Sequence, residues 1–306
     1  MLRHITTGID GSAESLAAAH WAARAAVRRG VSLSLVHAWK WHPRPAPSVP
    51  ADRSERDWAE ETLDRAASSI RAAHPGLRVV ERLVPDSAAA ALLAAAGEAE
   101  LLVLGSRGLS GVAGFMVGSV SQRVVARSSR PVVLVRAGES SADEHLPALD
   151  GISPEEMPET PYRDVVLGLD TQRPCDELIE FAFESARRCG ATLHVIHAFG
   201  TPRVEPADGP WTPVSGPELL AARERTVAAT LRPWCEKFPG VSVVETVSEG
   251  RAATALVRAS AGASLVVVGR RTREGHLGTH IGTHVGAVTH AVLHHVGCPV
   301  AVVPHD

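Results

Sequence analysis

Short apolar runs alternate with alanine-rich, amphipathic stretches along the whole chain. In the first half, the apolar runs predict strands at residues 3–9, 32–38, 78–83, 101–105 and 131–136. The stretches between them predict helices at 13–29, 54–73, 87–97 and 119–128. Because short β-rich runs bracketed by helices are typical of parallel strands buried on both faces, we expect a parallel sheet covered by helices. Right-handed crossovers then give a doubly wound, Rossmann-like α/β fold that binds ligands beyond the carboxyl ends of its strands.

The second half of the chain repeats the first. Gly-Ile-Asp10 returns as Gly-Leu-Asp170, and Pro131-Val-Val-Leu-Val135 returns as Pro299-Val-Ala-Val-Val303. A repeat this long indicates a duplicated domain, because solenoid units span only about 20–50 residues. We therefore expect two tandem domains, 1–137 and 162–306, each with a five-stranded parallel sheet flanked by helices. Residues 138–161 carry acidic residues and prolines but no Lys or Arg, which predicts an exposed acidic linker.

A glycine-rich loop follows the apolar run 101–104. It reads Gly105-Ser-Arg107-Gly108, then nine residues, then Gly118-Ser119 at the start of a predicted helix. Glycine allows a ligand to approach the backbone closely. The unpaired N–H groups of a helix N-terminus suit a phosphate. The pattern therefore predicts a phosphate-binding loop. The hydroxyl of Ser121 is a further candidate hydrogen-bond donor to the phosphate. Arg107 is either a phosphate contact or a solvated charge.

The spacing Gly-x-x-Gly-x9-Gly-Ser resembles the ATP-binding signature of the universal stress protein family. The stretches Ile5–Ser12 and Gly118–Val135 resemble the first strand and the last helix and strand of that family. The resemblance implies that Asp10 faces the adenosine, or a Mg²⁺ ion on the phosphates; the alternative is a helix N-cap. Val36, His37 and Ala38 end the second strand, where their backbone groups would contact the adenine.

The second half keeps only part of this pattern. Asp170 is present, but the loop reads Gly269-Arg-Arg-Thr272, so threonine replaces the second glycine and resists positive φ. The helix start has two possible registers, Gly282-Thr283 or Gly286-Ala287, and the sequence that follows favours Gly286. We therefore expect ATP mainly in the first half, with Asp170, Gly269 and Gly286 as the matching residues of the second.

Composition and the absence of certain motifs exclude several other classes of protein. Of the 306 residues, 45% are hydrophobic and 21% are charged, and the net charge is −3, as in a soluble globular protein without a nucleic-acid or membrane partner. Neither of the two lysines, Lys40 and Lys237, follows a glycine, so a Walker A loop is absent. The four cysteines form no C-x-x-C pair, which predicts reduced thiols in a cytoplasmic protein. The histidines make no His-Glu-x-x-His motif, and we expect no protein-held metal.

Three functional hypotheses remain. We favour an ATP-binding regulatory protein of the stress response, without enzymatic turnover, that acts on a protein partner the sequence does not identify. A slow ATPase or another nucleotide-using enzyme is the alternative, and Asp10 is its strongest candidate acid or base. A third possibility is a scaffold whose loops no longer bind nucleotide. The apolar last strands of the two halves predict edge pairing, either between two chains or within one chain as a pseudo-dimer.

Overall fold

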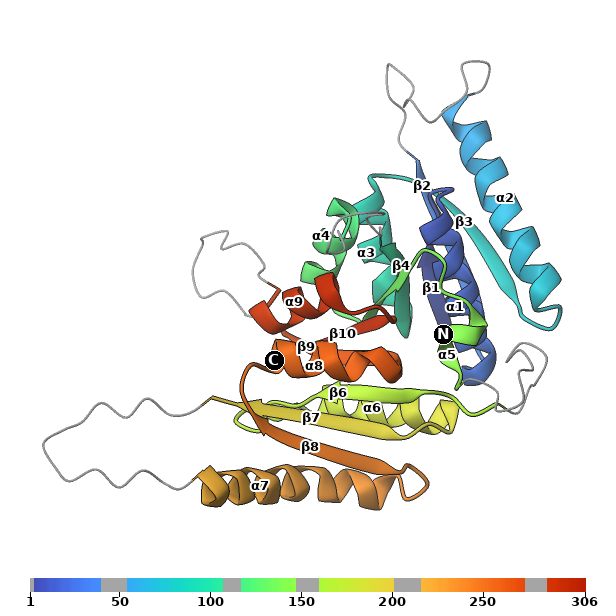
Figure 1. Ribbon diagram of the computed structural model, residues 1–306. Helices are drawn as coiled ribbons and strands as arrows, with labels where there is room; N and C mark the ends of the chain where they lie inside the picture. The colour runs from blue at the N-terminus through green and yellow to red at the C-terminus, as the bar shows by residue number, and fades with distance from the viewer. Residues whose placement is uncertain (1–2, 40–53, 107–116, 147–159, 201–215, 273–284) are drawn as a thin grey trace, which may run out of the picture.

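The two halves of the computed structural model contain the same elements in the same order (Figure 1). The structure describes residues 3–39, 54–106, 117–146, 160–200, 216–272 and 285–306. The first half consists of β1 (His4–Gly8), α1 (Ala13–Arg29), β2 (Ser32–Trp39), α2 (Glu55–Ala73), β3 (Val79–Pro85), α3 (Ala88–Glu98), β4 (Leu101–Ser106), α4 (Ser119–Arg127) and β5 (Val132–Arg136). A short helix, α5 (Ser141–Glu144), follows it.

The second half contains β6 (Asp164–Gly168), α6 (Asp176–Cys189), β7 (Leu193–Phe199), α7 (Gly216–Lys237), β8 (Val243–Glu249), α8 (Ala252–Ala259), the 3-10 turn Ser260–Gly262, β9 (Ala263–Arg271), α9 (Ala287–His295) and β10 (Val300–His305). Local signals in the sequence explain where the first helix begins and ends. The side chain of Ser12 accepts a hydrogen bond from the Ser15 N–H, and Gly30 ends the helix with a φ of 65°. Gly190 ends α6 in the same left-handed conformation.

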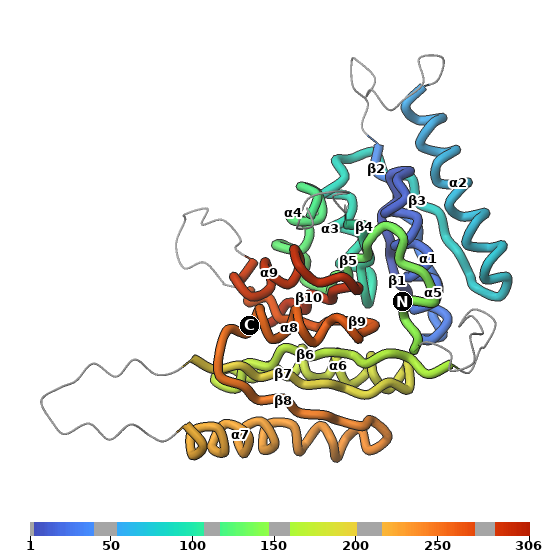
Figure 2. The backbone as a smooth tube through the Cα atoms, in the orientation of Figure 1, coloured from blue at the N-terminus to red at the C-terminus, as the bar shows by residue number. Residues whose placement is uncertain are grey.

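One sheet of ten strands runs through both halves, in the order β3-β2-β1-β4-β5-β10-β9-β6-β7-β8. Within each half all neighbouring strands are parallel, which confirms the doubly wound α/β prediction. The predicted pair of five-stranded sheets is therefore joined rather than separate. The tube in Figure 2 places α2 beside β3 at one end of this sheet and α7 beside β8 at the other.

The junction between the halves is an antiparallel pair formed by their last strands. Ala301 of β10 lies opposite Val133 of β5, and both side chains are fully buried. This pairing confirms the intrachain alternative for the two apolar strands. Association with a second chain stays a prediction.

Two arginines, one from each half, reinforce the junction. The guanidinium of Arg136, at the end of β5, donates to the carbonyl of Val296, which ends α9. The guanidinium of Arg270, near the end of β9, donates to the carbonyl of Ser128, which ends α4, at 2.5 Å. Each half thus satisfies a helix C-terminus of the other half, where carbonyls lack partners in the helix itself.

Two apolar layers cover the sheet, and each continues across the junction. Helices α1, α2, α6 and α7 pack on one face around residues such as Ile5, Leu35 and Phe183. Helices α3, α4, α8 and α9 pack on the other face around residues such as Leu102, Val124 and Val266.

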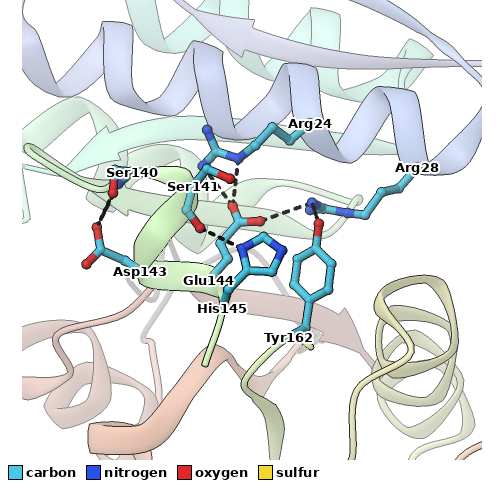
Figure 3. Close-up of polar contacts among 8 residues, drawn as sticks. All are labelled: Arg24, Arg28, Ser140, Ser141, Asp143, Glu144, His145 and Tyr162. Carbon is cyan, nitrogen blue, oxygen red and sulfur yellow. Dashed lines mark hydrogen bonds and ion pairs between the residues drawn. The ribbon is translucent and has the colours of Figure 1, made fainter. Parts of the chain in front are cut away.

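The segment predicted to be an exposed linker is instead packed at its start. Glu144 is 2% exposed and accepts hydrogen bonds from Arg24 and Arg28 of α1 (Figure 3). His145 lies against the ring of Tyr162, with centroids 4.0 Å apart, and the two residues form a β-bridge. The acidic composition misled the prediction because one of these carboxylates, Glu144, is buried by pairing with two arginines of α1. Residues 147–159 lie outside the described residues.

Candidate functional site

Asp10 lies just beyond β1, where the first strand meets the first helix. Its Oδ1 accepts hydrogen bonds from the backbone N–H and the hydroxyl of Ser12, at 3.0 and 2.5 Å. The Ser12 hydroxyl in turn accepts from the Ser15 N–H and caps α1. Ser12 rather than Asp10 is therefore the N-cap. The carboxylate of Asp10 stays exposed at the carboxyl edge of the sheet.

Gly105 and Gly118 mark the end of β4 and the start of α4. The Ser121 hydroxyl, predicted as a phosphate donor, donates to the Gly105 carbonyl at 3.1 Å. A β-carbon on Gly105 would lie 2.6 Å from the carbonyl carbon of Glu14, so this glycine permits the close approach of α1. Gly118 is the N-cap of α4, and Ser119 is exposed beside it. Arg107 and Gly108 lie outside the described residues.

Hydrogen bonds and strand pairing hold the end of β2 in the sheet. The Val36 carbonyl accepts a hydrogen bond from the Ile9 N–H at 2.8 Å, and Ala38 pairs with Val84 of β3. The His37 side chain is buried with its ring edge toward Trp58, at 5.7 Å between centroids. Burial lowers the pKa of His37, and the nearby carboxylate of Asp10 partly opposes this shift. His37 is thus a packed, neutral residue near Asp10.

The second half reproduces this arrangement. The Thr289 hydroxyl donates to the Gly269 carbonyl at 2.8 Å, as Ser121 does to Gly105. Helix α9 begins directly after Gly286, so the structure supports the Gly286 register. Gly282 lies outside the described residues.

The acidic residue of the second half has a cationic partner. Oδ1 of Asp170 accepts from the Gln172 N–H at 3.0 Å, and its Oδ2 lies 3.0 Å from Arg271 at the end of β9. Both side chains are about half exposed, so the pair lies open at the strand ends.

A cleft of about 1360 Å³ opens at this edge of the second half. Its walls come from the ends of β6, β7 and β9, the first turn of α9 and the last turn of α4. The described residues that line it include one carboxylate, Asp170, and five arginines: Arg127, Arg173, Arg223, Arg270 and Arg271. The cleft is therefore strongly positive and suits an anionic ligand.

Arg270 is the most deeply buried of these arginines. It is 5% exposed, and burial lowers its pKa. Its hydrogen bond goes to a neutral carbonyl, that of Ser128, and no carboxylate of the described residues pairs with it. A buried cation without a counter-charge is costly, which makes this side chain a candidate anion ligand.

The comparisons with known proteins agree with this geometry. The profile of the universal stress protein family matches residues 1–136 and 161–304. The chain belongs to the universal stress protein family.

Two relatives from Mycobacterium tuberculosis match this chain over most of their own length. Universal stress protein Rv2005c of Mycobacterium tuberculosis is 31% identical over 281 residues, covering 90% of this chain and 89% of the relative. Universal stress protein Rv2623 of the same organism is 31% identical over 286 residues, covering 90% and 88%. A solved universal stress protein from Archaeoglobus fulgidus superposes with a TM-score of 0.66 at 18% identity and covers 99% of this chain and 98% of its own. It supports the fold.

In this universal stress protein, Thr272, which stands where the family pattern has its second glycine, is held by several hydrogen bonds. The Thr272 N–H and hydroxyl both donate to the His305 carbonyl, at 2.6 and 3.0 Å, and the hydroxyl also lies 2.6 Å from Asp306 Oδ1. His305 also fills the space beside Gly269, where a β-carbon would lie 2.6 Å from its Nε2. Thr272 therefore fixes the residue after β9 to the end of β10.

Several residues of the cleft carry no signal in the sequence. Arg223 comes from α7 and lies over the ring of Phe199, with 5.8 Å between its Cζ and the ring centroid. Residues 126–129 come from the first half and reach the cleft only because β5 pairs with β10. A motif search along one half cannot find contacts that the other half supplies.

Proposed function

We propose that this universal stress protein is a nucleotide-binding regulatory protein that holds ATP at the carboxyl edge of its sheet, without turning it over. The observation that carries the proposal is the arginine-lined cleft of the second half, which opens at the helix start after Gly286. A phosphate there would meet the N–H groups of α9 and the charges of Arg270 and Arg271. The glycine loop of the first half, which resembles the family's ATP signature, suggests ATP as the nucleotide.

Both halves are included in the proposal. The sequence favours the first half because its glycine loop is intact, whereas the described cleft lies in the second. Gly118 and Gly286 occupy the same place, as N-caps of α4 and α9. We expect adenosine near Asp10 and Asp170, and phosphates near the two helix starts. A Mg²⁺ ion on the phosphates would fit the exposed Asp10 carboxylate.

Two of the titratable groups that line the second cleft, Asp170 and His197, support binding rather than catalysis. Asp170 pairs with Arg271, and Nδ1 of His197 hydrogen-bonds the Leu169 carbonyl at 3.0 Å. Both groups are thus engaged by neighbouring residues instead of pointing unpaired toward a nucleophilic water. We infer that bound ATP acts by stabilising one state of the protein for a partner protein in the cytoplasm.

The test is a calorimetric titration of the purified full chain with Mg-ATP. A β-carbon at Gly118 or Gly286 would have no atom of the described residues within 4 Å, so Gly118→Val and Gly286→Val place new atoms at the helix starts where phosphate would lie. We expect wild type to bind two ATP per chain, and each variant to bind one. Gly76→Val, at a glycine of similar open surroundings between α2 and β3, is the matched control and should bind two. Absence of binding in wild type would refute the proposal.

Turnover is tested in the same samples. ATP and ADP are separated after incubation with Mg-ATP, and we expect the ADP fraction to stay constant over hours. ADP that accumulates in wild type but not in Asp10→Ala would instead favour the enzyme hypothesis.

A further inference from the structure

Arg270 occupies a position where the two halves differ. The glycines Gly105 and Gly269 take equivalent places near the ends of β4 and β9, opposite Val135 and Val303 of the last strands. The residue that follows is Ser106 in the first half and Arg270 in the second. The arginine places a buried positive charge where the first half has a small hydroxyl.

The side chain of Arg270 contacts both the second cleft and the first half. It lines the cleft, and its Nη2 donates to the Ser128 carbonyl. Ser128 is the C-cap of α4, and a cation at a helix C-terminus stabilises the helix. The opposite end of α4 is Gly118-Ser119, the proposed phosphate contact of the first half.

From this geometry we propose that Arg270 couples the two ligand sites, so that an anionic nucleotide in the second cleft strengthens nucleotide binding in the first half. The inference rests on the proposed function. Arg270 has no carboxylate partner among the described residues, and a phosphate would supply the missing counter-charge. Because a guanidinium carries five N–H groups, Arg270 can hold a phosphate oxygen while it keeps the Ser128 carbonyl.

The direction of the coupling follows from what each ligand would order. A phosphate on Arg270 fixes the guanidinium against Ser128 and so fixes the C-terminal turn of α4. The nucleotide of the first half then meets a helix that is already ordered, and it loses less conformational entropy on binding. Coupling through thermodynamic linkage is reciprocal, so each nucleotide strengthens the other by the same factor, which we expect to be about five- to tenfold.

The experiment compares affinities for Mg-ATP, measured by calorimetry on the full chain. Gly286→Val reports the first site alone, and Gly118→Val reports the second site alone. The product of these two single-site association constants is compared with the product of the two association constants of wild type. Independent sites would make the two products equal. We expect the wild-type product to be about five- to tenfold larger.

Variants at Arg270 and Arg271 then identify the residue responsible. When Arg270→Gln is present in all three proteins, the ratio of the two-site product to the product of the single-site association constants should be near one. Arg270→Lys should restore part of the coupling. Arg271→Gln is the matched control, because Arg271 lines the same cleft but pairs with Asp170 instead of the first half. It should weaken the second site and leave the ratio unchanged. Thermal unfolding of each variant verifies that it is folded.

The outcomes separate the two proposals. If wild type binds ATP at two independent sites, or at one site only, the coupling is wrong while nucleotide binding stands. If Arg270→Gln keeps the full ratio, another route carries the coupling and the role of Arg270 is wrong. If wild type binds no ATP, both proposals fail.

Discussion

Arg24 and Glu144 form a buried ion pair that ties the segment after the first half to the first helix. Nη2 of Arg24 lies 2.7 Å from Oε1 of Glu144, and the two side chains are 14% and 2% exposed. Arg28 contacts the other carboxylate oxygen at 3.0 Å and also donates to the Tyr162 hydroxyl (Figure 3). Arg24 and Arg28 therefore hold both ends of the connection between the halves, Glu144 and Tyr162, against α1.

Replacing Glu144 by alanine would leave two arginines facing each other without their counter-charge. Because breaking a buried ion pair from one side is strongly destabilising, Glu144→Ala should lower the free energy of unfolding by about 3 kcal/mol. Urea denaturation measures this change. Glu60→Ala is the control, since Glu60 pairs with Arg56 on the exposed surface of α2, and it should cost less than about 0.5 kcal/mol. Equal losses in the two variants would contradict the ion-pair account.

Glu139 predicts a dependence of stability on pH. Burial, reinforced by the carboxylates of Asp143 and Glu144 and opposed by Arg24 and Arg136, raises its pKa from 4.5 to about 7. The folded state therefore binds this proton more tightly than the unfolded state. The associated stability is present below pH 4.5 and is lost as the pH rises through about 7. Urea denaturation at pH 5 and pH 8 should show a smaller decrease in Glu139→Gln than in wild type, and an identical decrease would disprove the assignment.

Substitution of Gly105 should cause a severe packing defect. In Gly105→Ala the new β-carbon would lie 2.6 Å from a backbone atom of Glu14, so α1 must move away from β4. Overpacking against backbone should cost about 3 kcal/mol, as measured by thermal or urea unfolding. Gly97→Ala makes the same change in α3, where the new β-carbon meets no atom of the described part of the chain within 4 Å, and it should stabilise the protein by about 0.5 kcal/mol. A stable Gly105→Ala protein would contradict the close approach.

The thiol of Cys298 should be unreactive in the folded protein. Burial raises its pKa to about 12, and the thiolate is the reactive form. At pH 8, iodoacetamide should therefore label Cys298 at least about 1000-fold more slowly in the native protein than in urea. Mass spectrometry of the Cys298 peptide follows the reaction. Labelling at the same rate in both states would show that the thiol is accessible.

Local sequence signals predicted most of the fold. Ser12 and Gly30 delimit α1 by capping chemistry that acts within a few residues, and the apolar run 132–135 is a buried strand as expected. The same run predicted edge pairing, because an apolar edge strand needs a partner. The sequence left the partner open, since a second chain and the other half of the same chain offer equivalent strands.

The candidate site was less predictable because part of it is assembled across the two halves. Asp170, Gly269 and Gly286 lie together as the repeat indicates. The contact between Arg270 and Ser128 joins residues far apart in the chain, and it exists only because β5 and β10 pair. Glu144 is a similar case, because its acidic surroundings suggest exposure while its partners lie on a distant helix.

The pairing of β5 with β10 also determines how many strand edges the protein can offer to others. Each half by itself would have two edge strands, and one from each half, β5 and β10, is paired inside the chain, so the sheet grows no further from its middle. Among the described residues, β3 and β8 are the outer strands, and β3 carries the ion-paired side chains Glu81 and Arg82. Charged outer strands resist edge-to-edge growth. The duplicated chain is in this sense a closed pair, because the two apolar strands that could each have recruited a second chain are already paired with each other.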